Sequence, residues 1–265
     1  MSEQSIQVVD YERRDGIAYL KLNRPRKLNA FTDDMSIQLL AAMERFDGDQ
    51  DALAAILHGE GRAFCSGADV QQRQLRSREE FEELGGAEGR GVRTLDIFTR
   101  SVHWKPVVAL VHGYALGVGL ALALSADLVV AEEGCRMQVT ETARGLASSR
   151  IWAMLAARGT GGFALDAALT GRYFSAEEAF GAGVVDRLAP AGEGLAVALE
   201  LSQAMAANPP LAVRAIVRSR RRRLDLLERE MAFETAPLNL HLTEDFKQSA
   251  LAFAQKRKPE PFVGR

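Results

Sequence analysis

The chain begins with short apolar runs and continues into a segment of helical periodicity. Residues 6–11 and 17–22 have the length and apolar content of strands, and Arg14-Asp15-Gly16 between them is typical of a hairpin turn. Thr32 stands where a helix N-cap is expected, because two acidic residues follow it and apolar side chains then recur at helical spacing. Those apolar side chains are Met35, Leu39, Leu40, Met43 and Phe46. A helix is therefore predicted there, followed by a short buried strand at residues 54–57.

A second unit repeats the alternation of strand and helix. We expect a strand at residues 107–111, a helix at 117–125 and a strand at 128–131, preceded by a polar helix at 78–99 that four glycines interrupt. Residues 107–130 are apolar enough to cross a bilayer, which takes about 20 residues of helix. They include His112, Gly113, Ser125 and Asp127, so buried strands joined by a turn and a helix explain them better. Interleaved strands and helices predict a layered α/β core with crossover connections.

The pattern changes beyond Gly192, where helical periodicity replaces strands. Helices are predicted at residues 195–207, 210–223, 224–236 and 243–256, with breaks at Asn208-Pro209-Pro210 and at Pro237. The last strand pattern is at residues 184–188. We therefore divide the chain into an α/β core at residues 1–192 and a helical carboxy-terminal module at 193–265.

Composition agrees with a globular protein and excludes several classes. Of 265 residues, 47% are hydrophobic and 26% charged, and the net charge of −2 provides no overall attraction to nucleic acid or to an anionic membrane. Two cysteines are too few for a disulfide framework, and no signal-peptide pattern is seen at the amino terminus, so we expect a cytoplasmic, reducing setting. The basic run from Arg218 to Arg223 lacks interleaved aromatics, and we expect it to stay solvated at a helix end, where it complements the helix dipole.

Two glycine-rich segments carry the candidate chemistry. Residues 59–70 follow a predicted strand, and Gly67 allows a sharp turn that leaves the next amide free. Residues 111–120 pass from strand through glycines into a helix, whose first amides attract anionic oxygen. The spacing fits neither the dinucleotide fingerprint nor a P-loop. Each segment alone is more often structural than functional.

Taken in order, seven segments resemble the crotonase family, also called the enoyl-CoA hydratase/isomerase family. The first three are Leu22-Asn23-Arg24-Pro25 with Leu28-Asn29-Ala30-Phe31, Ala63-Phe64-Cys65-Ser66-Gly67-Ala68-Asp69, and Gly113-Tyr114-Ala115-Leu116-Gly117-Val118-Gly119. The others are Ala126-Asp127-Leu128, Leu169-Thr170-Gly171 with Ser175-Ala176-Glu177-Glu178-Ala179, Gly183-Val184-Val185, and Phe253-Ala254-Gln255-Lys256-Arg257-Lys258-Pro259. The resemblance extends almost from end to end.

The resemblance implies a fold, an assembly and a site. It implies a crotonase-like spiral of ββα turns around two stacked sheets, with a helical carboxy-terminal trimerisation module that assembles the chain as a trimer or hexamer. It also implies that the amides of Ala68 and Val118 form an oxyanion hole for the thioester of an acyl-CoA, of the kind met in fatty acid metabolism. Preorganised amides stabilise the enolate, and losing one typically costs on the order of 3 kcal/mol. Val118 replaces a glycine that is common in relatives, so its side chain must point away from the thioester.

The acid/base residues depart from the family's hydratase pattern. Hydratases use two glutamates around one water; here Ala121 matches the first position and Glu141 the second. One carboxylate can move a proton between two carbons, as single-glutamate isomerases of the family do, whereas hydration lacks its second carboxylate unless Glu132, Glu133, Arg144 or Ser149 replaces it. The alternatives left open are hydration, isomerisation, thioester hydrolysis, decarboxylation, and a catalytically silent acyl-CoA binder.

Binding of coenzyme A is implied by further matches. Arg26, Lys27 and Leu28 are expected along the nucleotide and pyrophosphate, and the backbone of Ser66 and Ala68 at the adenine. Asp69, Val70 and Gly117 belong to the same binding segments, and Lys256 matches a tail lysine that reaches the ligand of a neighbouring subunit in relatives. Coenzyme A is expected as part of the substrate, with no other cofactor and no metal.

Two remaining residues have simpler explanations. His112 follows a buried strand, and we expect it to make a structural hydrogen bond rather than to act in catalysis. Cys65 lies in the first glycine-rich segment without an evident histidine partner, which makes a nucleophilic thiol a minor alternative.

Overall fold

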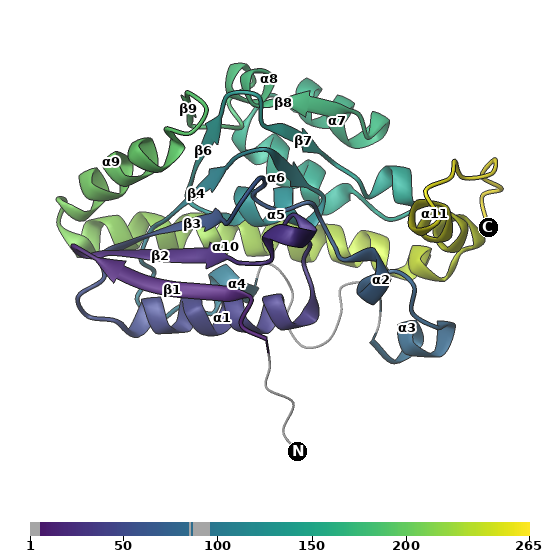
Figure 1. The fold of residues 1–265 in the computed structure, drawn as a ribbon, viewed down its shortest axis with the longest axis horizontal. Coiled ribbons are helices and arrows are strands. Elements are labelled where there is room, and N and C mark those ends of the chain that lie inside the picture. The colour runs from purple at the N-terminus through teal and green to yellow at the C-terminus, as the bar shows by residue number, and fades with distance from the viewer. Residues whose placement is uncertain (1–5, 85, 87–95) are drawn as a thin grey trace.

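A six-stranded sheet lies at the centre of the molecule (Figure 1), in a computed structural model that describes residues 6–84, 86 and 96–265. Its order is β1-β2-β3-β4-β6-β9, with an antiparallel β1–β2 hairpin and parallel pairing elsewhere. The strands are β1 (Val9–Arg14), β2 (Ile17–Leu22), β3 (Ala54–Gly59), β4 (Val107–Val111), β6 (Leu128–Glu132) and β9 (Arg187–Ala189). The predicted α/β core with crossover connections is confirmed.

The amino-terminal hairpin forms where it was predicted, with a shift of its first strand. Asp15 and Gly16 turn the chain with positive φ angles of 48° and 77°, so Arg14 pairs with Ile17. The predicted strand at residues 6–11 instead begins at Val9 and continues to Arg14. Alternation of apolar side chains identifies a strand's existence better than its ends, because the register is fixed by the turn.

The helices confirm the predicted types and correct some bounds. Thr32 caps the first of them by accepting a hydrogen bond from the amide of Met35. The helices are α1 (Asp33–Gly48), α2 (Val70–Arg73), α3 (Arg78–Leu84), α4 (Asp96–Thr99), α5 (Val118–Ser125), α6 (Ser149–Arg158), α7 (Gly161–Thr170), α8 (Ala176–Gly181), α9 (Gly194–Ala206), α10 (Pro210–Thr235) and α11 (Glu244–Ala254). Of the predicted helix at 78–99, residues 85 and 87–95 lie outside the described residues, and α3 and α4 occupy its two ends.

A second, three-stranded sheet agrees with the two stacked sheets that the resemblance implies, although its individual strands were not predicted. It is formed by β5 (Tyr114–Leu116), β7 (Arg136–Gln138) and β8 (Tyr173–Ser175), in the order β5-β7-β8. Strands of three residues are too short to show an alternation in sequence. Residues 107–130, apolar enough for a membrane span, contain β4, β5, α5 and β6. No helix among the described residues has the length and apolar character to cross a membrane.

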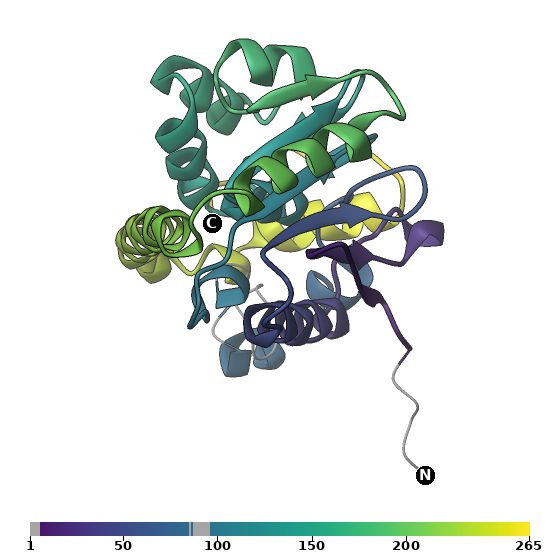
Figure 2. The same ribbon diagram turned by 90° about the vertical axis from the view of Figure 1, so that its left-hand side faces the viewer.

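The carboxy-terminal helices cover the core in two ways. Helix α9 packs against β3 and β4 of the large sheet, and Figure 2 shows it lying across the strands. Helix α10 crosses α6 and also contacts α4. The prediction of separate helices at 210–223 and 224–236 was wrong, because nothing at their junction interrupts the backbone hydrogen bonds of α10. The last predicted strand, at 184–188, was also misplaced, since β9 is limited to Arg187–Ala189.

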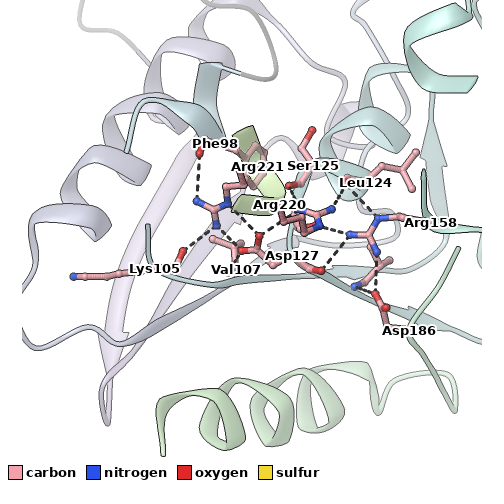
Figure 3. A network of polar contacts seen from close by, with 12 residues as sticks. Phe98, Lys105, Val107, Leu124, Ser125, Asp127, Arg158, Asp186, Arg220 and Arg221 are labelled. Atoms are coloured by element: carbon pink, nitrogen blue, oxygen red, sulfur yellow. Dashed lines mark hydrogen bonds and ion pairs between the residues drawn. The ribbon is translucent and has the colours of Figure 1, made fainter. Parts of the chain in front are cut away.

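Two arginines of the basic run in α10 are anchored in the core, whereas Arg218, Arg222 and Arg223 are exposed as predicted. Arg221 is 1% exposed and binds Asp127 through two contacts, from Nε at 3.1 Å and from a terminal nitrogen at 2.5 Å. Its other hydrogen bonds reach the carbonyls of Phe98 and Lys105. Arg220 donates to Asp127 and to the carbonyls of Leu124 and Ser125 (Figure 3). The expectation that this run stays solvated was therefore wrong for these two arginines.

Candidate active site

The two glycine-rich segments lie against each other through backbone hydrogen bonds. The amide of Cys65 donates to the carbonyl of Tyr114 at 3.0 Å, and the amide of Leu116 returns a bond to the carbonyl of Cys65 at 3.0 Å. A Cβ atom at Gly119 would lie 2.6 Å from the Cys65 carbonyl oxygen. Only glycine at this position therefore allows α5 to pack so close to the first segment. This packing brings Ala68 and Val118 to the same cavity.

The cavity has a volume of about 370 Å³ and contains two backbone amides without acceptors. Ala68 follows Gly67, whose φ of 98° turns the backbone, and Val118 is the first residue of α5 after Gly117. Neither amide donates a hydrogen bond to any residue within 6–84, 86 and 96–265. The amide of Val118 is in the first turn of α5, where amides have no acceptor within the helix, and the turn at Gly67 leaves the amide of Ala68 without an acceptor as well.

Glu141 lines the same cavity, and its position is fixed by a tight turn. The carbonyl of Glu141 accepts hydrogen bonds from the amides of Arg144 and Leu146, around a 3-10 helix at Thr142–Arg144. Thr140 Oγ1 donates to Glu141 Oε2 at 3.4 Å. Burial raises the pKa of the Glu141 carboxyl to about 7, against smaller lowering effects from hydrogen bonds and from Arg144. A carboxyl with that pKa accepts and returns protons near neutral pH.

Gly117 allows the start of α5 to touch the turn that carries Glu141. Its φ is 49°, and its amide donates to the carbonyl of Gln138 at 2.9 Å. A Cβ atom at this position would lie 2.3 Å from Thr140 Oγ1 and 3.0 Å from Glu141 Oε1. The missing side chain therefore lets Val118 and Glu141 line the same cavity.

Ala121, one helical turn into α5, also lines the cavity. Its methyl group stands where the resemblance implies a second glutamate in hydratases. The other suggested replacements do not line the cavity: Glu132 accepts from the amide of Gly194, and Glu133 is exposed. Arg144 lies 3.9 Å over the ring of Phe253, and the buried Ser149 hydroxyl has no hydrogen-bond partner in the described chain.

Several cavity residues were missed by sequence reasoning. Arg150 of α6 and Glu228 of α10 form an ion pair at 2.5 Å in the wall, and Glu228 is 5% exposed. The other missed polar residues in the wall are Arg73, Gln74, Thr235, Asn239 and His241. One signal was present: Val217, Arg221, Leu224 and Glu228 are the buried residues of α10, at helical spacing. Charged residues within such a stripe indicate buried ion pairs, and dividing α10 at residue 223 concealed the stripe.

The residues expected to bind coenzyme A lie in two places, beside the first glycine-rich segment and after α11. The carbonyl of Leu28 accepts from the amide of Ser66 at 3.0 Å, so the loop with Arg26 and Lys27, both exposed, runs beside the first glycine-rich segment. Asp69, just before Val70 of α2, has a structural role, because its carboxylate caps α2 and pairs with Arg24 at 3.1 Å. Lys256 is exposed after α11 and does not line the cavity.

The two residues with simpler explanations behave as expected. His112 Nε2 makes a hydrogen bond of 3.0 Å to the carbonyl of Gly61. Cys65 is fully buried, and burial raises the pKa of its thiol to about 12, which makes it a poor nucleophile. In the part of the chain that the structure describes, no group of three His, Cys, Asp or Glu side chains is arranged to hold a metal ion.

Comparisons with known proteins agree on one family. Residues 12–263 match the family model for enoyl-CoA hydratase/isomerase. The chain is 32% identical over 253 residues to an enoyl-CoA hydratase of Mycobacterium tuberculosis, covering 94% of each protein. It is 30% identical over 261 residues to the short-chain-enoyl-CoA hydratase of Clostridium acetobutylicum, covering 96% of this chain and 97% of that one. The solved structure of a carnitinyl-CoA dehydratase from Mycobacterium avium aligns with a TM-score of 0.75 at 32% identity, covering 96% of this chain and 98% of that one.

Proposed function

Because the chain belongs to the enoyl-CoA hydratase/isomerase family, we propose that it converts an acyl-CoA thioester through an enolate, with Glu141 carrying the proton. The observation that carries this proposal is the shared cavity of two acceptor-free amides and a carboxyl whose pKa is raised to about 7. The thioester oxygen would accept from the amides of Ala68 and Val118. Such donors stabilise charge that develops on oxygen, typically by about 3 kcal/mol each.

The presence of Ala121 in the wall favours a double-bond shift over hydration. The Glu141 carboxylate takes a proton from carbon 2 of a 3-enoyl-CoA, and the electron pair of that bond moves onto the thioester oxygen. The protonated Glu141 then delivers the proton to carbon 4, and the electrons return from oxygen to give the 2-enoyl-CoA. Hydration needs a second group to position water, and Glu228, the other carboxylate in the described part of the wall, is paired with Arg150. Coenzyme A enters as part of the substrate, and this proton transfer needs no further cofactor.

Matched substrates distinguish the two chemistries. The purified protein is incubated with a 2-enoyl-CoA and a 3-enoyl-CoA of the same length, and the products are followed by mass spectrometry. Hydration adds the mass of one water, whereas isomerisation leaves the mass unchanged and moves the double bond. We expect turnover of the 3-enoyl-CoA, and a fall of about 100- to 10,000-fold in Glu141→Gln, because the general acid/base is lost.

Exposed Glu133 provides the control for that substitution. Glu133→Gln removes the same charge outside the cavity and should retain wild-type turnover. An unchanged rate in Glu141→Gln would remove Glu141 from the mechanism. Binding of acyl-CoA thioesters without turnover across both substrate classes would instead show a silent binder, and release of free coenzyme A would show thioester hydrolysis.

We further propose that the chain assembles as a homotrimer or hexamer, with Lys256 reaching the ligand of a neighbouring subunit. The family resemblance and the exposed position of Lys256 support this assignment. Light scattering coupled to size-exclusion chromatography measures the assembled mass directly, and a monomer under all conditions would contradict it.

A further inference from the structure

One wall of the cavity, formed by α2, contains buried polar groups without hydrogen-bond partners. Arg73 and Gln74 both line the cavity, and Arg73 is 4% exposed. Arg73 Nε and Gln74 Oε1 are fully buried and make no hydrogen bond, although Arg73 Nε lies within ion-pair distance of Asp33. A guanidinium has five N–H donors, and none of those on Arg73 makes a hydrogen bond to another residue that the structure describes. Buried polar groups normally have hydrogen-bond partners, so this wall is suited to a ligand that supplies the missing partners.

Asp33, the carboxylate that forms an ion pair with Arg73, is shared with a second arginine. Asp33 Oδ2 lies 2.7 Å from a terminal nitrogen of Arg76, while its Oδ1 lies 3.5 Å from Arg73 Nε. Two buried guanidinium groups thus share one carboxylate, which leaves one positive charge without a full counter-charge among the residues that the structure describes. The ring of Phe31, 5.6 Å from Arg73 Cζ, offers only weak compensation. A buried charge without a partner is costly in free energy.

The other charges in the wall do not neutralise Arg73. Arg150 and Glu228 compensate each other at 2.5 Å. Glu141 is largely protonated below its pKa of about 7 and is used in catalysis. Burial lowers the pKa of the His241 imidazole, which disfavours a positive charge on this side chain. Counted over the described wall residues, the cavity therefore has an excess of positive charge at α2, the short helix that follows Ala68.

We propose that the acyl group of the substrate carries a carboxylate, and that Arg73 binds this carboxylate in the cavity. The inference rests on the proposed function, because it assumes that an acyl-CoA occupies this cavity. A plain hydrocarbon chain would keep Arg73 from water and give it no partner, whereas a carboxylate matches its planar N–H donors. The phosphates of coenzyme A are a second source of negative charge, but every acyl-CoA has them, so a matched pair of acyl groups separates the two sources.

Two six-carbon thioesters form that pair: adipyl-CoA, with a terminal carboxylate, and hexanoyl-CoA, with a terminal methyl. Neither has a double bond, so isothermal titration calorimetry on the assembled wild-type protein measures binding alone. We expect adipyl-CoA to bind on the order of 10- to 100-fold more tightly, since a charge-assisted hydrogen bond to a buried group is worth about that ratio. Equal affinities, or tighter binding of hexanoyl-CoA, would overturn the proposal without any variant.

Substitution of Arg73 tests whether this residue causes the preference for adipyl-CoA. Arg73→Met should abolish the preference for adipyl-CoA, while Arg78→Met, on the exposed face of α3 with 66% of its side chain accessible, should keep it. If circular dichroism shows that Arg73→Met does not fold, Arg73→Gln replaces it. A preference that survives the loss of the Arg73 charge would refute the role of Arg73.

Turnover of the corresponding 2-enoyl-CoA and 3-enoyl-CoA substrates separates this proposal from the proposed function. Tighter binding of adipyl-CoA with no turnover of any enoyl-CoA would support charge recognition and reject the enzymatic role. Turnover of substrates with and without the carboxylate at equal kcat/KM, together with equal binding, would reject only the role of Arg73.

Discussion

At the scale of single residues, the site depends on groups kept away from their usual partners. The amides of Ala68 and Val118 donate to no described residue, and Arg73 lacks a full counter-charge. Each costs stability in the free protein, and in the proposed function each would gain its partner from a bound ligand. Sequence resemblance predicted the two amides and Glu141, which lie in continuous motifs and which the structure brings to one cavity. It missed Arg73, since a single arginine in a short polar helix has no pattern that distinguishes it from a surface residue.

The raised pKa of Glu141 predicts a rate that depends on pH. The carboxylate must be ionised to accept a proton, and its pKa is about 7 because it is buried. We expect kcat/KM for the proton transfer to rise about tenfold per pH unit below pH 7 and to level above it, as a single ionisation in the free enzyme requires. A pH profile measured with a 3-enoyl-CoA tests this. A profile that is flat between pH 5 and 8 would contradict the assignment.

The same shift makes a prediction for stability, with the opposite trend. The folded carboxyl has a pKa of about 7 and the unfolded one about 4.5, so between these values the folded chain holds a proton that the unfolded chain has released. The stability from this group is present below pH 4.5 and is lost as pH rises to 7. Glu141→Gln should therefore raise the unfolding free energy at pH 8 by at most about 3 kcal/mol, and with it the Tm. At pH 4.5 the substitution should have little effect. Equal changes in Tm at both pH values would argue against a raised pKa.

At the scale of elements, the geometry of the candidate site is set by how closely the start of α5 approaches the later turn that carries Glu141. The sequence predicted α5 and β4 well, because their apolar residues are numerous and continuous. It did not reveal that β5 and β7 place Gly117 beside Thr140, because three-residue strands are defined by pairing with distant segments. Similarly, α10 was divided in the prediction, although its buried stripe continues through the junction.

Gly117→Ala tests that close approach. The added methyl would lie 2.3 Å from Thr140 Oγ1, at a φ of 49° that side chains rarely adopt. We expect a loss of about 2 to 5 kcal/mol in unfolding free energy and about 100-fold in kcat, because α5 must move away from Glu141. Gly134→Ala is the control: its φ is 77°, but nothing lies within 4 Å of the new methyl, so it should cost about 1 to 2 kcal/mol and keep full activity. Full activity in Gly117→Ala would show that the approach is not required.

At the scale of the whole molecule, α10 connects the stability of the core to the cavity. Arg220 and Arg221 hold the middle of the helix on Asp127, whose Oδ2 also accepts from the amide of Val107 at 2.8 Å (Figure 3). Further along, α10 contributes Glu228 and Ala232 to the cavity wall. The division into a core at 1–192 and a module at 193–265 remains a prediction. Residues far apart in the sequence meet in this network, which is why no local pattern identified it.

Removing Arg221 should therefore affect both stability and ligand binding. Asp127, with 8% of its side chain exposed, would keep a buried charge without its bidentate partner in Arg221→Met, at a cost of about 3 to 5 kcal/mol in unfolding free energy. Arg229→Met, on the same helix with 60% of its side chain exposed, should cost under about 0.5 kcal/mol. Urea unfolding at matched protein concentration measures both, since an assembly makes stability depend on concentration. Because α10 also forms a wall of the cavity, acyl-CoA affinity should fall in Arg221→Met and not in Arg229→Met. A destabilised variant that binds with wild-type affinity would show that the network supports the core without positioning the site.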